Sequence, residues 1–419
     1  MLKEKIYKAK RTIYPAYAAV RGCMGRFAVR WFSLPLLILF AFGCFALVTH
    51  LEGYRLGGLK VSLYVYQFYL CDYSVGFCSR LLVGAVVTFF ADVVSTDLMD
   101  VIINVSVILS LVLQAAAAGV ILRIAMKRGS LLCCGIVLLF LCSPLAIKQN
   151  MEMPGHVDIY LLLLFLLWLA CYRTPAVYWI TPPLCLVGMA IHIEFFCMFL
   201  PPMLILLMYR AAAWEKKRAR VCSAVSLAAS SAVSAGSLIW FVAFANKHLK
   251  MTADEFYYRM LARFRTDPVT RNANNYRIGT PIFKPYFDAH LFGEGDLQLN
   301  AALTGKTNEV FVFNTPSDYL QFMFAFAKYG WNDWKHEIVV FIPIAVIMCL
   351  IWGICAVKEK GLKRFVFFCF AAQMLVLVPE VMVSTDAWRF ITAAFISQFA
   401  VFFAVYYDEK SRLNRLLRL

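Results

Sequence analysis

The sequence predicts an all-α, polytopic integral membrane protein with about ten transmembrane helices and interfacial helices on its outer face. Of the 419 residues, 62% are hydrophobic and only 16% are charged, and the mean hydropathy is +0.71. Apolar runs of about twenty residues match a hydrocarbon core about 30 Å thick. Short basic loops separate these runs, as the positive-inside rule expects of cytoplasmic loops.

The apolar runs are predicted to cross the bilayer in alternating directions, as one membrane domain, 1–419. A basic segment, 1–31, precedes the first run, and because no small-residue cleavage site follows, it indicates an uncleaved signal-anchor. A basic tail, 408–419, follows the last run. Both termini are therefore expected in the cytoplasm, in a multi-pass protein of the cell membrane. The predicted spans are 33–50, 101–125, 131–147, 159–172, 176–191, 195–209, 221–246, 337–357, 365–383 and 389–407.

The apolar run 81–94, within the first outer loop 51–99, is too short to cross comfortably, and we expect it to be interfacial or re-entrant. Counting it as a span would move every later basic cluster to the outside. With the run outside, 25 of the 41 Lys and Arg residues are cytoplasmic, whereas 20 of the 25 acids and all 6 histidines lie on the outer side. Acid, base and cation candidates therefore gather at the outer surface.

A long outer loop, 247–336, connects the seventh and eighth spans. Thr252 to Glu255 has the form of a capping box, and apolar residues follow it at helical spacing. The aromatic stretch 319–331 predicts a second helix along the outer interface. Aromatic side chains of this loop can stack on sugar rings.

Charge and cysteine usage narrow the function classes. The formal net charge of +16 arises in cytoplasmic loops, which favour anionic headgroups, so no nucleic-acid partner is expected. Most of the 14 cysteines lie in apolar runs, where thiols behave as small hydrophobes. Cys71 and Cys78 can form a disulfide or stay free. The chain has neither a Gly-x-x-x-x-Gly-Lys nor a Gly-x-Gly-x-x-Gly motif, which argues against a cytoplasmic ATP or nucleotide-sugar enzyme.

The first candidate site follows the first span. The carboxylate of Asp72 can act as general base towards a hydroxyl acceptor, and Arg80 can hold a phosphate. The alternative is a structural Asp–Arg pair that fixes the loop, or an arginine that snorkels to the headgroups.

The second candidate site precedes the span 159–172 and contains His156 and Asp158, with Glu152 nearby. Pro154 and Gly155 predict a turn that presents the imidazole at the membrane surface, where it can bind substrate. Asp158 can equally be a helix cap.

The third candidate site is His192-Ile193-Glu194, between two closely spaced spans. On a helix, residues two apart do not share a face, so we expect this pair not to bind one metal together. An ionisable pair near membrane depth indicates function. The alternative is a buried pair that joins two helices.

The fourth candidate site lies at the outer mouth of the last span. Asp386 and Arg389 are three residues apart and share a helix face. Arg389 can bind a phosphate while Asp386 orients it, or the two can form an internal ion pair.

In its plan the chain resembles the glycosyltransferase C superfamily and related bacterial polysaccharide polymerases. The resemblance rests on Asp72 after the first span, Arg80 opening an apolar segment, His192 and Glu194 between middle helices, a long outer loop, and a late Asp386…Arg389 element. It implies an enzyme that uses polyprenyl-phosphate-linked sugars at the outer membrane face. By the resemblance, Asp72 would be the base or orient the acceptor, and Arg80 or Arg389 would bind the donor phosphate. The chain lacks the paired acids that many members carry after the first span.

These observations predict transfer of a sugar from a polyprenyl-phosphate carrier to a hydroxyl acceptor, a glycan or a lipid, at the outer face of the bilayer. The catalytic candidates are Asp72, His192 and Glu194; the substrate-binding candidates are Arg80, His156, Asp158, Asp386 and Arg389. No cofactor or metal ligand is predicted, and dependence on a divalent cation stays open. The alternatives are a lipid-linked-glycan flippase or other transporter, and a non-catalytic component of an envelope assembly.

Overall fold

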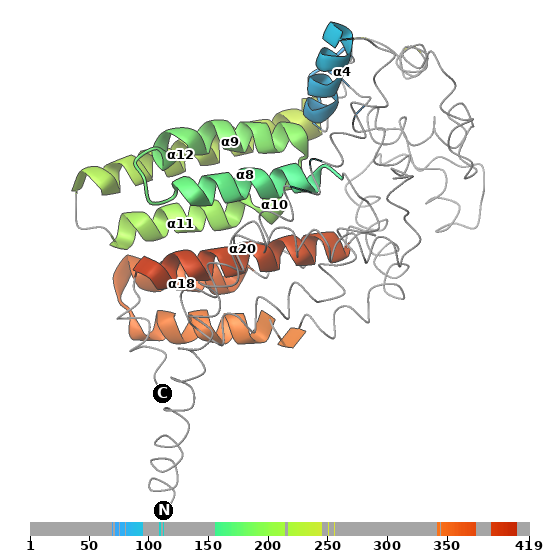
Figure 1. Ribbon diagram of the computed structural model, residues 1–419. Helices are drawn as coiled ribbons and strands as arrows, with labels where there is room; N and C mark the ends of the chain where they lie inside the picture. Colours follow the sequence, from blue (N-terminus) through green and yellow to red (C-terminus); the bar gives the residue numbers. More distant parts are fainter. Residues whose placement is uncertain are drawn as a thin grey trace, which may run out of the picture. The chain divides into compact units, whose positions relative to one another are not determined.

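A computed structural model of the protein describes part of the chain (Figure 1). The described residues are Tyr69, 72–74, 76–79, 81–94, Leu109, Val112, 156–213, 217–244, Lys250, Glu255, 342–343, 345–373 and 387–408. Within them every regular element is a helix, which confirms the all-α prediction for this part. Leu109 and Val112 belong to one compact unit, 1–61 with 105–155; all other described residues belong to a second unit, 62–104 with 156–419.

The short apolar run of the first outer loop forms one helix, α4 (Leu82–Val94). Its 13 residues span about 20 Å at about 1.5 Å per residue, less than the hydrocarbon core. Gly84, Val87 and Ala91 are buried on the face that packs against α9, whereas Phe89 and Phe90 are exposed. The helix thus buries small side chains and exposes large apolar ones such as Phe89 and Phe90.

Two helices of nearly equal length form an antiparallel hairpin, α8 (Asp158–Cys171) and α9 (Val177–Ile191). Both are almost wholly apolar, and the turn between them is short. The indole of Trp168 donates a hydrogen bond to Thr181 Oγ1 across the pair at 2.8 Å. Because the helices match in length, the start of α8 and the end of α9 lie at the same end of the hairpin.

The predicted span 195–209 is divided into α10 (Phe195–Met198) and α11 (Leu200–Ala213). Pro201 and Pro202 follow the break and lack the N–H groups that would bond to the carbonyls of residues 197 and 198. The two helices together cover the predicted span, and the stretch Phe195–Ala213 is long and apolar enough to cross a membrane.

The next span begins earlier and ends earlier than predicted, as α12 (Lys217–Ile239), followed by a π-helix, η3 (Trp240–Phe244). Serine side chains form a buried stripe along α12, which packs against α9 and α11. Small residues at three- and four-residue spacing let helices approach closely. The stripe consists of Ser223, Ser226, Ser230, Ser234 and Ser237.

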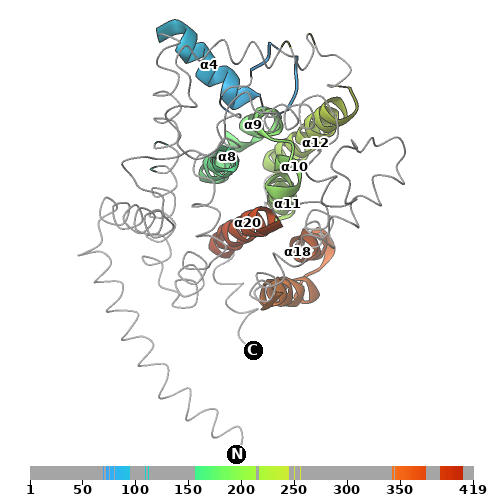
Figure 2. The same cartoon turned by 90° about the vertical axis from the view of Figure 1, so that its right-hand side faces the viewer.

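The C-terminal helices are Ala345–Lys358, α18 (Gly361–Ala372) and α20 (Ala387–Asp408). Figure 2 shows the bundle end-on, with α18 and α20 beyond α11, which contacts both. A hydrogen-bonded network lies buried between these C-terminal helices. Trp352 Nε1 donates to Gln398 Oε1 at 2.9 Å, and Gln398 Nε2 donates to Gln373 Oε1 at 2.7 Å.

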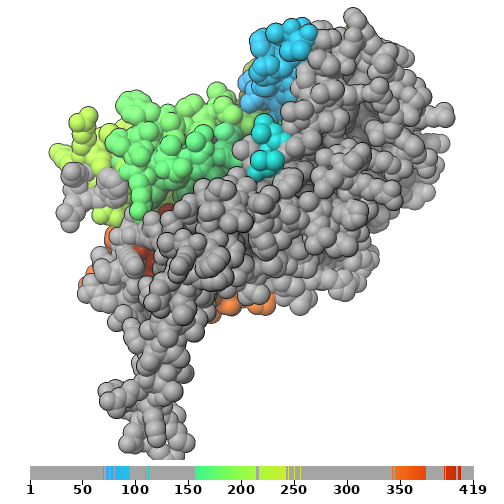
Figure 3. Space-filling view, in the orientation of Figure 1, coloured from blue at the N-terminus to red at the C-terminus, as the bar shows by residue number. Residues whose placement is uncertain are grey.

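Among the described residues, two helical stretches are long and apolar enough to cross a membrane, Phe195–Ala213 and Lys217–Ile239. Shorter apolar helices accompany them, and large apolar side chains such as Trp179, Val221 and Val225 are exposed on the bundle, whose α8–α12 part is green to yellow in Figure 3. The predicted spans 33–50, 101–125 and 131–147 and the loop 247–336 lie outside the described residues, apart from the isolated Leu109, Val112, Lys250 and Glu255.

Candidate functional site

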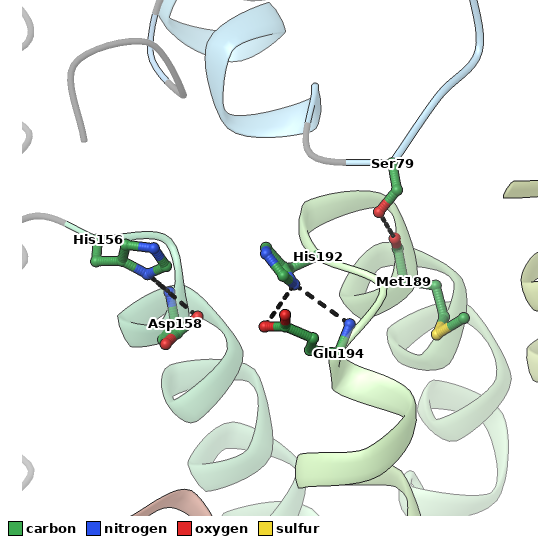
Figure 4. Close-up of polar contacts among 6 residues, drawn as sticks. All are labelled: Ser79, His156, Asp158, Met189, His192 and Glu194. Carbon is green, nitrogen blue, oxygen red and sulfur yellow. Dashed lines mark hydrogen bonds and ion pairs between the residues drawn. The ribbon is translucent and has the colours of Figure 1, made fainter. Parts of the chain in front are cut away.

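Two His-x-acid turns meet at one end of the helix bundle (Figure 4). One precedes α8 and carries His156 and Asp158; the other joins α9 to α10 and carries His192 and Glu194. The imidazole rings lie 6.4 Å apart between centroids, inclined by 51°. The sequence places these residues in separate motifs, and the hairpin of α8 and α9 brings them together.

His156 and Asp158 form a buried contact pair at the start of α8. His156 Nδ1 lies 3.2 Å from Asp158 Oδ1, and the Asp158 backbone N–H points to the same nitrogen at 3.3 Å. Asp158 is the first residue of α8, so its negative charge stabilises the positive end of the helix dipole. The N-cap position itself is occupied by Val157.

His192 and Glu194 form a second pair of the same design. His192 Nδ1 lies 3.1 Å from Glu194 Oε2, and the Glu194 N–H points to that nitrogen at 3.2 Å. Side chains two residues apart diverge on a helix, but these two lie together because His192 is not helical. His192 ends α9 with an extended backbone, φ −159° and ψ 130°, which turns both side chains to the same side.

A glycine and a phenylalanine hold this turn in place. The ring of fully buried Phe195 lies against Gly188, where an added Cβ would stand only 2.6–2.8 Å from ring carbons. His192 N–H donates to the Gly188 carbonyl at 2.9 Å, and Phe195 N–H donates to the His192 carbonyl at 3.0 Å. The close approach at Gly188 thus fixes the geometry of His192.

Two contacts compete for Nδ1 of His192. The Glu194 N–H donates to Nδ1 only while that nitrogen keeps its lone pair, whereas an ionised Glu194 carboxylate favours a proton on Nδ1 that donates to the carboxylate. In the second arrangement Nε2 has the lone pair and can accept a proton. The same reasoning applies to His156 and Asp158. Each pair can therefore work as a histidine general base oriented by a carboxylate.

The two pairs differ in their access to solvent. His192 is 1% exposed, and the Glu194 side chain is 19% exposed. His156 and Asp158 are both buried. In Figure 4 the carboxylate of Glu194 lies on the side of its own turn that faces α8.

The loop before α4, which contains residues 72–79, is hydrogen-bonded to α9 close to this site. Ser79 Oγ donates to the carbonyl of Met189 at 2.8 Å, in the last turn of α9 (Figure 4). Within the loop, Asp72 is buried, and its Oδ1 accepts the Ser74 N–H at 2.8 Å. This Asx turn gives Asp72 a structural contact within the loop.

The remaining predicted site residues contribute no described side chains. Arg80 and Asp386 lie outside the described residues, as does Glu152. Arg389 lies in the first turn of α20, and its side chain is outside the description. Among the residues that the structure describes, no group of three His, Cys, Asp or Glu side chains is arranged to hold a metal ion.

Sequence reasoning missed Ser79 and a tyrosine pair. Tyr69 and Tyr160 share a hydrogen bond at 3.0 Å between their hydroxyl oxygens, and this bond joins the loop to the first turn of α8. Burial raises the pKa of Tyr69, so its hydroxyl stays protonated. Neither residue belongs to a recognisable motif, and only the folded chain reveals them.

No known protein-family model, curated protein or solved structure matches the chain.

Proposed function

We propose that the chain is a multi-pass membrane glycosyltransferase that moves a sugar from a polyprenyl-phosphate-linked donor to a hydroxyl acceptor at the outer face. The observation that carries this proposal is the pair of histidine–carboxylate contacts at one end of an apolar helix bundle. Acid–base groups at the end of such a bundle suit a substrate whose lipid lies in the bilayer and whose sugar lies at its surface.

In the proposed reaction, His192 Nε2 takes the proton of the acceptor hydroxyl while the acceptor oxygen attacks the anomeric carbon. The bond between that carbon and the phosphate oxygen breaks, and polyprenyl phosphate leaves with the bonding electrons. Glu194 stabilises the imidazolium that forms. The reaction needs no ATP, because the phosphate of the carrier is already the leaving group.

His156, whose ring lies 6.4 Å from that of His192, and Asp158 are proposed to orient the substrate. Arg80 or Arg389 is proposed to offset the charge on the departing phosphate, as the resemblance implies. Asp72 is proposed to orient the acceptor, with its Oδ1 held by the Ser74 N–H.

The proposal includes ten spans with both termini in the cytoplasm. The two long apolar helices and the exposed apolar side chains of the bundle support insertion in a membrane. A transporter is the rival proposal, and it requires ionisable groups along a central path. The buried network of Trp352, Gln373 and Gln398 is neutral, which favours a role in helix packing.

The test compares lipid-linked glycans and surface polysaccharide in cells with and without the protein. We expect the deletion to accumulate the lipid-linked donor and to lose one glycan product. Complementation with wild type should restore the product, whereas His192→Ala protein that inserts normally should not. Unchanged glycans in the deletion strain would contradict the transferase. A donor that accumulates on the inner leaflet only would indicate a flippase.

A further inference from the structure

Aromatic side chains from two distant segments form an exposed cluster, which we call the aromatic platform. Tyr73 and Phe77 come from the loop before α4, and Trp240, Phe241 and Phe244 come from η3. The ring centroids of Tyr73 and Phe77 lie 5.5 Å apart, and those of Phe77 and Phe241 lie 5.4 Å apart. The rings of Trp240 and Phe244 stack at 6.3 Å with only 23° between their planes.

Backbone geometry fixes the two halves of the platform to each other. Trp240 Nε1 donates a hydrogen bond to the carbonyl of Phe77 at 2.9 Å. Gly76 has φ 143°, a conformation that residues with a Cβ rarely adopt, and it turns the chain so that Phe77 stacks on Tyr73. The π-helical turn of η3 is a feature that recurs at functional sites.

Apart from the Tyr73 hydroxyl, the platform presents ring surface rather than hydrogen-bonding groups. Phe77 is 49% exposed, Phe244 is 44% exposed and Trp240 is 37% exposed. Since the indole N–H is bonded to Phe77, Trp240 offers its π-face. Electron-rich ring faces attract the weakly positive C–H face of a pyranose, in the same way that they attract cations and ring edges.

The platform is continuous with the histidine pairs. The loop that carries Phe77 is bonded to Met189 through Ser79, and Met189 lies in the last turn before His192. Moreover, η3 begins where the candidate span ends, at Ile239. On the proposed topology the outer face lies at this end of the span, which is where the sugars of a lipid-linked glycan would lie.

We propose that the aromatic platform binds pyranose rings of the acceptor glycan and positions its hydroxyl for His192. This inference rests on the proposed function, because it names a substrate subsite of that reaction. The rival occupant is lipid, since Trp and Tyr also gather where membranes meet water. Two features favour the glycan: the loop that carries Phe77 is bonded to the last turn of α9 before His192, and the Trp240 indole N–H is already bonded to Phe77 and so is not offered to a lipid headgroup.

The experiment measures binding of the purified full chain, in lipid nanodiscs, to an array of neutral and acidic oligosaccharides. The variants are Phe77→Leu and Phe244→Leu, which keep apolar volume but remove the ring face. We expect wild type to bind a subset of the array and each variant to bind it about fivefold to tenfold more weakly. Trp179→Leu, which removes an exposed tryptophan at the start of α9, is the matched control and should bind like wild type.

A second measurement identifies lipid as the occupant if the proposal is wrong. Nanodiscs with brominated phospholipid quench tryptophans that touch lipid, and Trp240→Phe reports the share due to Trp240. We expect little change in quenching from that variant. No oligosaccharide binding by wild type, equal binding by the leucine variants, or strong quenching of Trp240 would each overturn the platform. If the platform binds sugars while the deletion strain has normal glycans, only the transferase proposal fails.

Discussion

The imidazole rings of His156 and His192 face each other across 6.4 Å, although one precedes α8 and the other follows α9. The antiparallel hairpin explains this convergence, because its two helices have 14 and 15 residues. Each ring has a carboxylate two residues later in the chain, so the two halves of the site are similar in design. They need not share one role.

The first prediction separates those roles. His192→Ala should lower the rate of sugar transfer by about 10²–10⁴-fold, the range typical of general-base removal. His156→Ala should instead raise the KM for the donor or acceptor, since His156 is assigned to binding. Initial rates in membrane vesicles measure both. Glu359→Gln, in the loop before α18, is the matched control; equal kcat losses at both histidines would contradict the division.

The second prediction concerns Gly188. An added methyl group would overlap the ring of Phe195, so Gly188→Ala should displace the His192 turn and destabilise the protein by about 1–3 kcal/mol. Phe195→Ala removes the overlapping carbons, so the double variant should be no less stable than Phe195→Ala alone. Thermal unfolding of wild type, both single variants and the double variant in detergent measures these differences in stability. Gly236→Ala, inside α12, meets open space and should leave the stability equal or higher. Additive losses from Gly188→Ala and Phe195→Ala would refute the contact between Gly188 and Phe195.

The third prediction concerns Arg210, near the end of α11 and 1% exposed. Its guanidinium donates to the carbonyls of Tyr172 and Thr174 and lies over the ring of Tyr178. Because these carbonyls follow the C-terminal end of α8, Arg210→Met should cost about 1.5–3 kcal/mol per lost charged hydrogen bond. Exposed Arg218→Met is the control. Equal melting temperatures for the two variants would show that Arg210 is replaceable.

The fourth prediction concerns the buried amide network. Gln398→Leu leaves Trp352 Nε1 and Gln373 Oε1 without their partner, at a cost of about 1–3 kcal/mol. Adding Gln373→Leu and Trp352→Phe removes the stranded groups and should recover part of the loss. The measurement is the free energy of unfolding. If the triple variant is less stable than Gln398→Leu by the summed losses of the single variants Gln373→Leu and Trp352→Phe, the three side chains do not form a coupled network.

The helices were largely predictable from the sequence, because apolar runs and basic boundaries are local signals. The run 81–94 corresponds to α4, and the run 389–407 corresponds to α20. The division of the span 195–209 was not foreseen, although Pro201 and Pro202 carried the signal. Hydropathy averages over such residues, whereas each missing N–H removes one specific backbone hydrogen bond.

The sequence singled out the residues of the candidate site but did not predict their geometry. His156, Asp158, His192 and Glu194 were each singled out, yet their meeting depends on the equal lengths of α8 and α9. The contact between His192 and Glu194 depends on one extended residue at the end of α9. Gly188, which fixes that turn through Phe195, carries no chemistry and gives no signal in a motif search.

The last prediction concerns Cys78, which is a buried free thiol in the structure, whereas Cys71 lies outside the described residues. Burial raises the pKa of Cys78 from 9.0 to about 11, and burial together with Cys78 raises the pKa of Tyr73 to about 12. The folded state therefore keeps the thiol proton longer than the unfolded state. The contribution of the protonated Cys78 thiol to the free energy of unfolding is therefore fully present below pH 9, and it should be lost as the pH rises towards 11.

Alkylation of a variant whose only cysteines are Cys71 and Cys78 measures this effect, because iodoacetamide reacts with the thiolate. At pH 8.5 the folded protein should react at Cys78 roughly tenfold or more slowly than the same protein in denaturant. Equal rates would show that the thiol is not shielded. Labelling of the denatured chain only after reduction would instead identify a disulfide with Cys71, and the loop that carries Phe77 would then be covalently closed.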